Sequence, residues 1–245
     1  MSWSPLPAAA LRRLDDLGAR YALGESARAA LAAFLQLLAS DPRPPTAVRD
    51  PLAAVDVHVA DALVALEVPE IRAAASLADL GSGAGIPGLV LAIALPAASV
   101  CLVESNRRKS AFICRAIEVS GVDNAVVVND RAETWGAGSA AQDVVTARAL
   151  APLNVVAEYA APMLRVGGTL VAWTGKREPE VEARAARAGE LLGLSGPVVF
   201  EVVPFAASAH RHLHIMSKVR ATPATFPRRP GVARKRPLGL AGTTV

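Results

Sequence analysis

Cysteine and long apolar runs are scarce in this sequence. Its two cysteines, Cys101 and Cys114, lack the spacing of metal ligands, so we interpret both as plain core residues. A membrane-spanning helix needs roughly 20 consecutive apolar residues, and no such run is present. The N-terminus lacks the basic start and long apolar stretch of a signal peptide. We therefore expect a cytoplasmic protein with no membrane partner.

Acidic residues are absent from residues 202–245, a segment that holds eight Lys and Arg residues. Its formal charge is +8, and since the whole chain is +4, residues 1–201 sum to −4. Five of these cations stand among prolines and glycines, where we expect no helix and where contact with an RNA phosphate backbone is favoured: Arg228, Arg229, Arg234, Lys235 and Arg236. The alternative is a disordered, solubilising tail.

Three histidines alternate along a predicted strand, at positions 210, 212 and 214. Alternate residues share one face of a strand. No fourth ligand or acidic residue is near them, so we do not expect a metal site. We interpret His210, His212 and His214 as a strand face at the surface or as an RNA contact.

The stretch LADLGSGAGIPG, residues 77–88, reads as a strand that runs into a tight loop. Gly81, Gly83 and Gly85 suit positive φ angles and the close approach of a ligand. Pro87 is suited to start the helix that follows, whose free N–H groups would face the loop. The pattern predicts a site for a nucleotide-like ligand. Both a dinucleotide and S-adenosylmethionine remain possible at this point, since G-x-G-x-x-G is also satisfied and Glu104 follows about 20 residues later.

Strands and helices alternate from Leu77 onward, which predicts an α/β fold with a largely parallel sheet. Seven strands are expected at 77–80, 98–104, 125–130, 143–149, 168–174, 197–203 and 211–219. Helices are expected at 87–95, 107–120, 152–165 and 178–193. No helix-length segment separates the last two strands, so we expect them to pair antiparallel.

The N-terminal part reads as a helical cap. Apolar spacing predicts two amphipathic helices within residues 6–39 and a third over 55–67. His58 and Asp61 lie three positions apart on that third helix. We interpret them as a surface pair, in preference to a hydrogen bond that faces the cleft. The expected domains are 1–75 for the cap, 76–220 for the catalytic domain and 221–245 for the basic tail.

Seven strands with an antiparallel last pair are typical of the class I, Rossmann-like S-adenosylmethionine-dependent methyltransferases. Glu104 closes the second strand, where a carboxylate can accept hydrogen bonds from both ribose hydroxyls. Asp130, Ala132 and Glu133 follow the third strand, where acceptor and backbone groups can contact the adenine amino edge. These positions favour S-adenosylmethionine as the cofactor.

The residues after the fourth strand bear on the methyl acceptor. The Asp/Asn-Pro-Pro-aromatic sequence of amine methylases is replaced by Ala147-Arg148-Ala149-Leu150, and neither cysteine lies on a loop as a nucleophile would. A nucleophile with a free lone pair at neutral pH, such as guanine N7, remains. Arg148 is expected at the methionine carboxylate or at guanine O6, the alternative being a structural ion pair with a helix acid such as Glu158. Lys176 either lines the cleft or is solvated.

Several motifs together resemble the GidB/RsmG methyltransferases over about residues 46–238, namely TAVRDP, HVADAL, DLGSGAGIPG, VESNRRKSAFI, RAE, TARAL, MLRVGGTLVAWTGK and PRRPGVARKRPLG. The resemblance implies methyl transfer from S-adenosylmethionine to N7 of a guanine in the 530 loop of bacterial 16S ribosomal RNA. It also implies cofactor contacts at Gly81, Ile86, Ala132, Glu133 and Arg148, next to the loop residue Gly83.

The expected partner is 16S ribosomal RNA or a precursor of the small subunit, and the protein is expected to be a monomer. Arg148 and Lys176 are the candidates for positioning guanine. Two alternatives stay open. One is a methyltransferase for another RNA, a protein or a small molecule. The basic, acid-free tail disfavours a small-molecule substrate. The other is a non-catalytic RNA-binding assembly factor, which the intact glycine loop disfavours.

Overall fold

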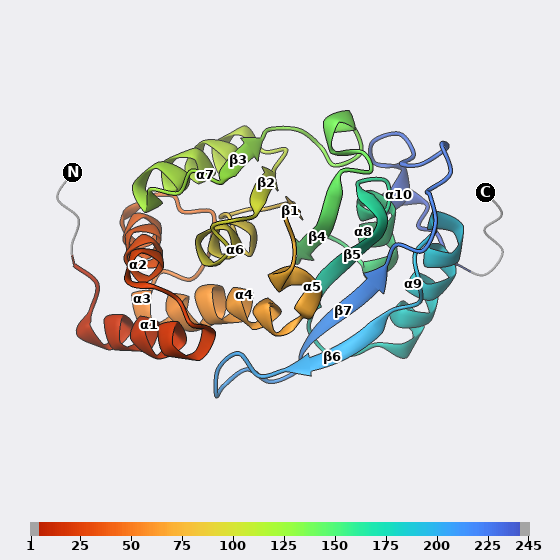
Figure 1. The fold of residues 1–245 in the computed structure, drawn as a ribbon. Helices are drawn as coiled ribbons and strands as arrows, with labels where there is room; N and C mark the ends of the chain where they lie inside the picture. The colour runs from red at the N-terminus through yellow and green to blue at the C-terminus, as the bar shows by residue number, and fades with distance from the viewer. Residues whose placement is uncertain (1–4, 241–245) are drawn as a thin grey trace.

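A seven-stranded sheet forms the centre of the computed structural model, which describes residues 5–240. The strand order is β3-β2-β1-β4-β5-β7-β6 (Figure 1). β1 to β5 are parallel, and β7 is antiparallel to both of its neighbours. The strand bounds are β1 (Ser76–Leu80), β2 (Ser99–Val103), β3 (Ala125–Val128), β4 (Gln142–Arg148), β5 (Leu164–Thr174), β6 (Val198–Val202) and β7 (Arg211–Ser217). The seven predicted strands and their antiparallel last pair are confirmed.

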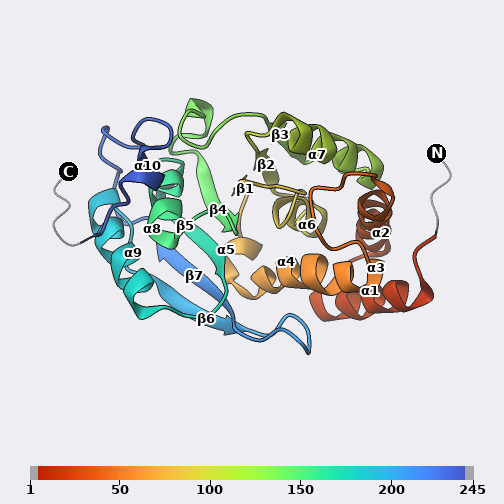
Figure 2. The ribbon, with the colours of Figure 1, turned by 180° about the vertical axis from the view of Figure 1, so that it is seen from behind.

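Helices cover both faces of the sheet. One side carries the N-terminal helices with α6 (Gly88–Ala94) and α7 (Arg107–Ser120), and the other carries α8 (Leu153–Ala160) and α9 (Pro179–Leu192), as Figures 1 and 2 show from opposite sides. The bounds of α7 agree with the prediction because both of its ends are capped. Asn106 Oδ1 accepts hydrogen bonds from the Arg108 and Lys109 N–H groups at 3.0 and 3.2 Å. Gly121 adopts a left-handed conformation at the C-terminal end.

The predicted helix over 152–165 is too long. α8 ends at Ala160, and β5 begins at Leu164, which pairs with Gln142 of β4. Pro162 explains the early end, because proline has no N–H group with which to continue the helix.

The N-terminal cap contains the predicted helices. These are α1 (Ala8–Tyr21), α2 (Glu25–Ser40) and a helical segment from 51 to 67 composed of α3 (Pro51–Ala54), η1 (Val55–Ala60), α4 (Asp61–Leu63) and η2 (Val64–Glu67), followed by α5 (Pro69–Arg72). Asp50 begins the long segment, since its side chain accepts a hydrogen bond from the Ala53 N–H at 2.7 Å. Phe34 and Leu63 are fully buried in the same apolar cluster as Leu89 of α6, so the cap and the sheet share a core. The domain boundary at residue 75 stays a prediction.

The C-terminal segment packs on the α8 side of the sheet. Phe226, Ala233 and Leu238 are buried in the apolar cluster that contains the α8 residues, and Asn154 Nδ2 donates to the Leu238 carbonyl at 2.7 Å. The expectation that this segment forms no helix was wrong, because Val232–Lys235 form the short helix α10. The buried apolar residues along this segment stabilise it enough to offset the low helix propensity of its prolines and glycines. Residues 241–245 of the predicted tail and 1–4 of the predicted cap lie outside the described residues.

The interpretations of the histidines near β7 and of the two cysteines are corrected. His212 and His214 are buried and are not part of a surface strand face, because α9 packs on this face of β7. The expectation that no acidic residue is near them was wrong, since Glu182 Oε1 of α9 lies 3.3 Å from His214 Nε2. His210 precedes β7 and is exposed. His212 Nδ1 lies 2.8 Å from the Gly175 carbonyl oxygen, and His214 Nδ1 lies 2.9 Å from Thr174 Oγ1. Cys101 is half-buried in β2, but Cys114 is exposed on α7 and is therefore not a core residue.

Two further observations concern residues 5–240, the part of the chain that the structure describes. Within that range no helix is long and apolar enough to cross a membrane. The same range contains no group of three or more His, Cys, Asp or Glu side chains that could hold a metal ion.

Candidate functional site

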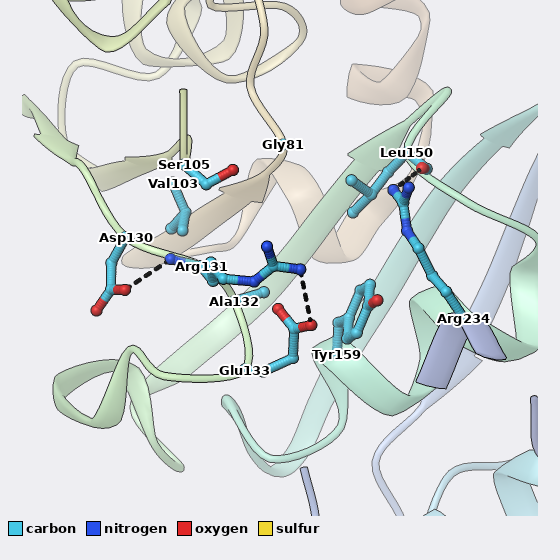
Figure 3. Close-up of a pocket in the computed structure, with 10 residues that line it drawn as sticks. All are labelled: Gly81, Val103, Ser105, Asp130, Arg131, Ala132, Glu133, Leu150, Tyr159 and Arg234. Atoms are coloured by element: carbon cyan, nitrogen blue, oxygen red, sulfur yellow. Dashed lines mark hydrogen bonds and ion pairs between the residues drawn. The ribbon is translucent and has the colours of Figure 1, made fainter. Parts of the chain in front are cut away.

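A cavity opens where β1, β2, β3 and β4 end (Figure 3). In open sheets of this kind, ligands bind outside the carboxyl ends of the strands, at the point where the strand order reverses. Here that point lies between β1 and β4. We call this the first cavity, and it is lined by Gly81, Val103, Ser105, Asp130, Arg131, Ala132, Glu133, Leu150, Tyr159 and Arg234.

The glycine loop forms one wall of the first cavity. Gly81 has a φ of 68°, and a Cβ there would lie 2.6 Å from Leu150 Cδ1. A side chain at this position would therefore collide with the residue that follows β4. Gly83 has a φ of 61° and donates its N–H to Glu104 Oε2 at 3.0 Å. The expected positive φ is confirmed at both positions and at Gly85, where φ is 88°, whereas the close approach of a ligand stays a prediction.

Asp79 stabilises the glycine loop through its buried side chain, a role that was not predicted from the sequence. The side chain is completely buried, and it accepts hydrogen bonds from Thr146 Oγ1 of β4 at 2.8 Å and from the Gly88 N–H of α6 at 3.1 Å. Burial raises the pKa of Asp79 to about 6, although both of these donors oppose that rise. The carboxylate thus joins β1, β4 and the start of α6. An acidic residue two positions before Gly81 was the available signal.

Glu104 lies at the end of β2, next to the cavity residues Val103 and Ser105. It is buried, and besides Gly83 it accepts from the Asn106 N–H through Oε1 at 2.7 Å. These two backbone donors fix the orientation of the carboxylate. The assignment of Glu104 to the ribose stays a prediction, as do those of Gly83 and Ile86, which do not line the first cavity.

Glu133 is the carboxylate inside the first cavity. Its Oε1 accepts from the Gly231 N–H at 3.0 Å and lies 3.4 Å from Arg131 Nη2, whose side chain crosses the cavity in Figure 3. Burial alone would raise the pKa of Glu133, but the Gly231 N–H and Arg131 are among the groups that hold it below its usual value. Glu133 is therefore ionised at neutral pH and ties the C-terminal segment to the loop after β3.

A second cavity of about 310 Å³ lies at the ends of β4 and β5, against the cap. It is lined by Val57, Asp61, Arg148, Ala149, Trp173, Thr174, Gly175 and Arg211. Arg148 Nη1 donates to Asp61 Oδ2 at 2.7 Å and to the Val57 carbonyl at 3.0 Å. Arg148 therefore lines this cavity and not the first one, and its role at the cofactor stays a prediction.

Two expectations about paired side chains are corrected. The alternative of an ion pair between Arg148 and a helix acid is found, but the acid is Asp61 of α4 and not Glu158, which pairs with Arg228. His58 and Asp61 are not a surface pair, since both are buried under the end of β4. His58 Nε2 lies 2.9 Å from Thr46 Oγ1 and Nδ1 lies 3.5 Å from Arg148 Nη2. Burial, with the charge of Arg148, lowers the pKa of His58 to about 4.

The remaining candidate residues, Lys176 and the basic residues of the C-terminal segment, do not lie in one site. Lys176 is exposed and lines a third cavity of about 480 Å³ at the end of β5. Of the basic residues of the C-terminal segment, Arg228 is engaged by Glu158, and Arg234 donates to the Leu150 carbonyl at 2.8 Å at the first cavity. The other three are exposed: Arg229, Lys235 and Arg236.

Comparison with known proteins identifies the family. The family model described as GidB, rRNA small subunit methyltransferase G, matches residues 30–212. The chain belongs to this family. A ribosomal RNA small subunit methyltransferase G of Rubrobacter xylanophilus is 42% identical over 201 residues, covering 79% of this chain and 77% of the relative. One of Chloroflexus aggregans is 41% identical over 197 residues, covering 79% and 82%.

Solved structures agree with this family in fold. The S-adenosylmethionine-dependent methyltransferase SibL, in its apo form, matches with a TM-score of 0.56 at 13% identity, covering 86% of this chain and 74% of that one. An S-adenosylmethionine-dependent O-methyltransferase from Thermotoga maritima matches with a TM-score of 0.53 at 14% identity, covering 66% of each. The class I methyltransferase fold predicted from the strand order is confirmed.

Proposed function

We propose that this protein transfers a methyl group from S-adenosylmethionine to N7 of a guanine in the 530 loop of bacterial 16S ribosomal RNA. The membership of the GidB family supports the reaction class and the RNA. The observation that carries the proposal is the first cavity, which a glycine loop and two buried carboxylates border at the ends of four parallel strands.

The residues around the first cavity suit S-adenosylmethionine, although its volume of about 80 Å³ is below the roughly 300–1,000 Å³ of small-molecule sites, so the cavity must widen when the cofactor binds. Gly81 leaves this wall of the cavity without a side chain, and a Cβ there would meet Leu150. A ligand can therefore approach the backbone at Gly81 closely. We assign Glu104 to the ribose hydroxyls, and Ala132 with Glu133 to the adenine. Gly81, Gly83 and Ile86 shape the loop around the ligand. When bound, the cofactor supplies an electrophilic methyl group.

The protein's own residues then bind and orient the acceptor. Guanine N7 has a free lone pair at neutral pH, so the reaction requires positioning and exclusion of water and does not require a strong base. Asp61 agrees with a reaction that requires no strong base, since its carboxylate is paired with Arg148. Arg148 and Lys176 stay candidates for positioning guanine.

The ribosomal RNA is expected to contact the exposed cations of the C-terminal segment, Arg229, Lys235 and Arg236. The substrate is 16S ribosomal RNA or a precursor of the small subunit, and the enzyme acts in the cytoplasm as a monomer. We propose that residues 1–75 are the cap, 76–220 the catalytic domain and 221–245 the RNA-contacting tail.

The function is tested by incubating the purified protein with methyl-labelled S-adenosylmethionine and small ribosomal subunits from cells that lack the gene. The RNA is then digested, and its nucleosides are identified by mass spectrometry. We expect 7-methylguanosine in one fragment, that of the 530 loop. Label in another RNA, in protein or in a small molecule would replace the proposed substrate, and RNA binding without any transfer would indicate an assembly factor.

A further inference from the structure

We propose that the second cavity holds the acceptor guanine and that Asp61 determines specificity by accepting a hydrogen bond from its Watson–Crick edge. This inference rests on the proposed function, because it assigns the base that receives the methyl group. It concerns a residue of the cap, outside the loops after β1, β2 and β3.

The two cavities lie on either side of one turn at the end of β4. Arg148 and Ala149 line the second cavity, and the next residue, Leu150, lines the first. Ala149 has a φ of 53°, a left-handed conformation that is uncommon for a residue with a side chain. Such backbone strain is concentrated at functional sites. The turn thus places a ligand of the second cavity next to a ligand of the first.

Asp61 presents a fixed acceptor to the second cavity. Asp61 is 4% exposed, and its Oδ2 accepts a hydrogen bond from Arg148 Nη1 at 2.7 Å. The backbone carbonyl of Asp61 accepts from Trp173 Nε1 at 2.7 Å, which fixes the helix against β5. Oδ1 lies 3.2 Å from Arg211 Nε in an ion pair, yet neither atom makes a hydrogen bond within residues 5–240, and Oδ1 has almost no exposed surface. The ion pair offsets only part of the cost of burying this oxygen. The Arg211 side chain is 36% exposed, so it can move aside for a ligand whose donor is better aligned with Oδ1.

Guanine has the donors that this oxygen requires. Its Watson–Crick edge carries the N1–H and the 2-amino group, whereas adenine has an acceptor at N1 and no 2-amino group. N7 lies on the neighbouring Hoogsteen edge, so a guanine whose Watson–Crick edge faces Asp61 leaves N7 free to face the turn at Ala149 and the first cavity.

The other walls suit a base that has left its stack. The guanidinium groups of Arg148 and Arg211 line the cavity, and bases of single-stranded RNA stack on such planes while their edges form hydrogen bonds. Two arginines and one aspartate also leave an excess positive charge for the anionic nucleotide. The cavity volume of about 310 Å³ is within the range of small-molecule sites, roughly 300–1,000 Å³.

The test compares three acceptors at the target position of small-subunit RNA, which is assembled by ligation to carry guanine, inosine or adenine. Methyl transfer to N7 is measured under single-turnover conditions. We expect the wild-type protein to prefer guanine over adenine, and the Asp61→Asn variant to lose about 10- to 100-fold of that preference, the effect of one hydrogen bond to a charged group. Inosine lacks only the 2-amino group. A loss with inosine in the wild type assigns the 2-amino group as the donor, and no loss assigns N1–H.

Asp56→Asn is the matched control. Asp56 lies on the same helical segment, pairs with Arg13 outside the cavity, and is expected to leave the preference unchanged. If Asp61→Asn slows guanine and adenine equally, Asp61 only holds Arg148 and the inference is overturned. The wild-type protein provides a readout even if that variant does not fold, since equal rates with all three bases would also overturn it. Absence of any transfer to guanine by the wild type would instead refute the proposed function.

Discussion

Arg228 Nε donates to Glu158 Oε1 at 2.8 Å and thereby joins the C-terminal segment to a carboxylate of α8 whose side chain is 1% exposed. Arg228 also donates to the Arg236 carbonyl at 2.9 Å, so one guanidinium fixes both α8 and the end of its own segment. Arg228 therefore stabilises the fold, whereas we propose that the exposed cations of this segment contact RNA.

Arg228→Ala should lower the free energy of unfolding by about 3–5 kcal/mol, because it leaves the Glu158 charge buried without its partner. Arg229→Ala removes an exposed cation of the same segment and should change stability by less than about 0.5 kcal/mol. Chemical denaturation of the three proteins measures both values. Equal stability of the two variants would show that the pair contributes nothing to the fold.

The first cavity could be predicted from the sequence because its parts are local. Each strand of the parallel sheet ends at the same edge, so the residues that follow β1, β2 and β3 could be assigned to one site from the strand pattern alone. Gly81, Glu104 and Glu133 are of this kind. The caps of α7 are local as well, which is why its bounds were found correctly.

The second cavity could not be predicted because distant residues assemble it. Arg148 and Asp61 are 87 positions apart, and their contact depends on how the cap packs on β4. On its own helix, the spacing of His58 and Asp61 is equally compatible with a surface pair. The same reason applies to Arg228 and Glu158, which are 70 positions apart. Charge composition indicates a basic surface, but it does not identify which cations are already paired.

Neutralising Arg229, Lys235 and Arg236 together should weaken RNA binding and make it less dependent on salt. Each phosphate contact contributes about 0.7 to the slope of log affinity against log salt for single-stranded RNA, so the slope should fall in magnitude by about 2. Arg228 and Arg234 are kept, because one stabilises the fold and the other lines the first cavity. RNA binding at several salt concentrations measures the slopes. Equal slopes would leave the segment without a role in RNA contact.

Glu104→Ala should weaken S-adenosylmethionine by roughly 1.5–3 kcal/mol, since it removes hydrogen bonds to a charged group. It also removes the acceptor of the Gly83 N–H, which loosens the loop. Calorimetric titration measures the affinity, and Glu118→Ala, an exposed position on α7, is the control. Unchanged affinity in the Glu104 variant, or tighter binding of NAD than of S-adenosylmethionine, would contradict the cofactor assignment.

Arg148→Lys should separate cofactor binding from methyl transfer. Lysine keeps the positive charge beside Asp61 but loses the planar fork, and Arg148 lines the second cavity. We therefore expect unchanged affinity for S-adenosylhomocysteine and a rate of transfer that falls by about tenfold or more, the loss of one hydrogen bond to a charged group. Titration and single-turnover kinetics measure the two effects. A parallel loss of cofactor affinity would place Arg148 at the methionine carboxylate instead.

His58 should make the protein less stable in acid. Its pKa is lowered from 6.5 to about 4 by burial and by Arg148, so the folded state binds the proton less readily than the unfolded state does. The stability that neutral His58 contributes is therefore fully present above pH 6.5, and it is lost as the pH falls from 6.5 to 4. Each unit of pKa difference corresponds to about 1.4 kcal/mol, so about 2–3 kcal/mol should disappear between pH 7 and pH 4.5.

The comparison of wild type with His58→Gln isolates this contribution. Glutamine does not titrate, and groups distant from His58, such as Glu133, titrate alike in both proteins. The free energy of unfolding, measured by denaturation at pH 7 and at pH 4.5, should therefore fall by about 2–3 kcal/mol more in the wild type than in the variant. Parallel falls in the two proteins would mean that His58 is not held neutral beside Arg148. Because Nδ1 faces Arg148 at 3.5 Å, Arg148→Lys should retain the effect as long as its charge stays at that position.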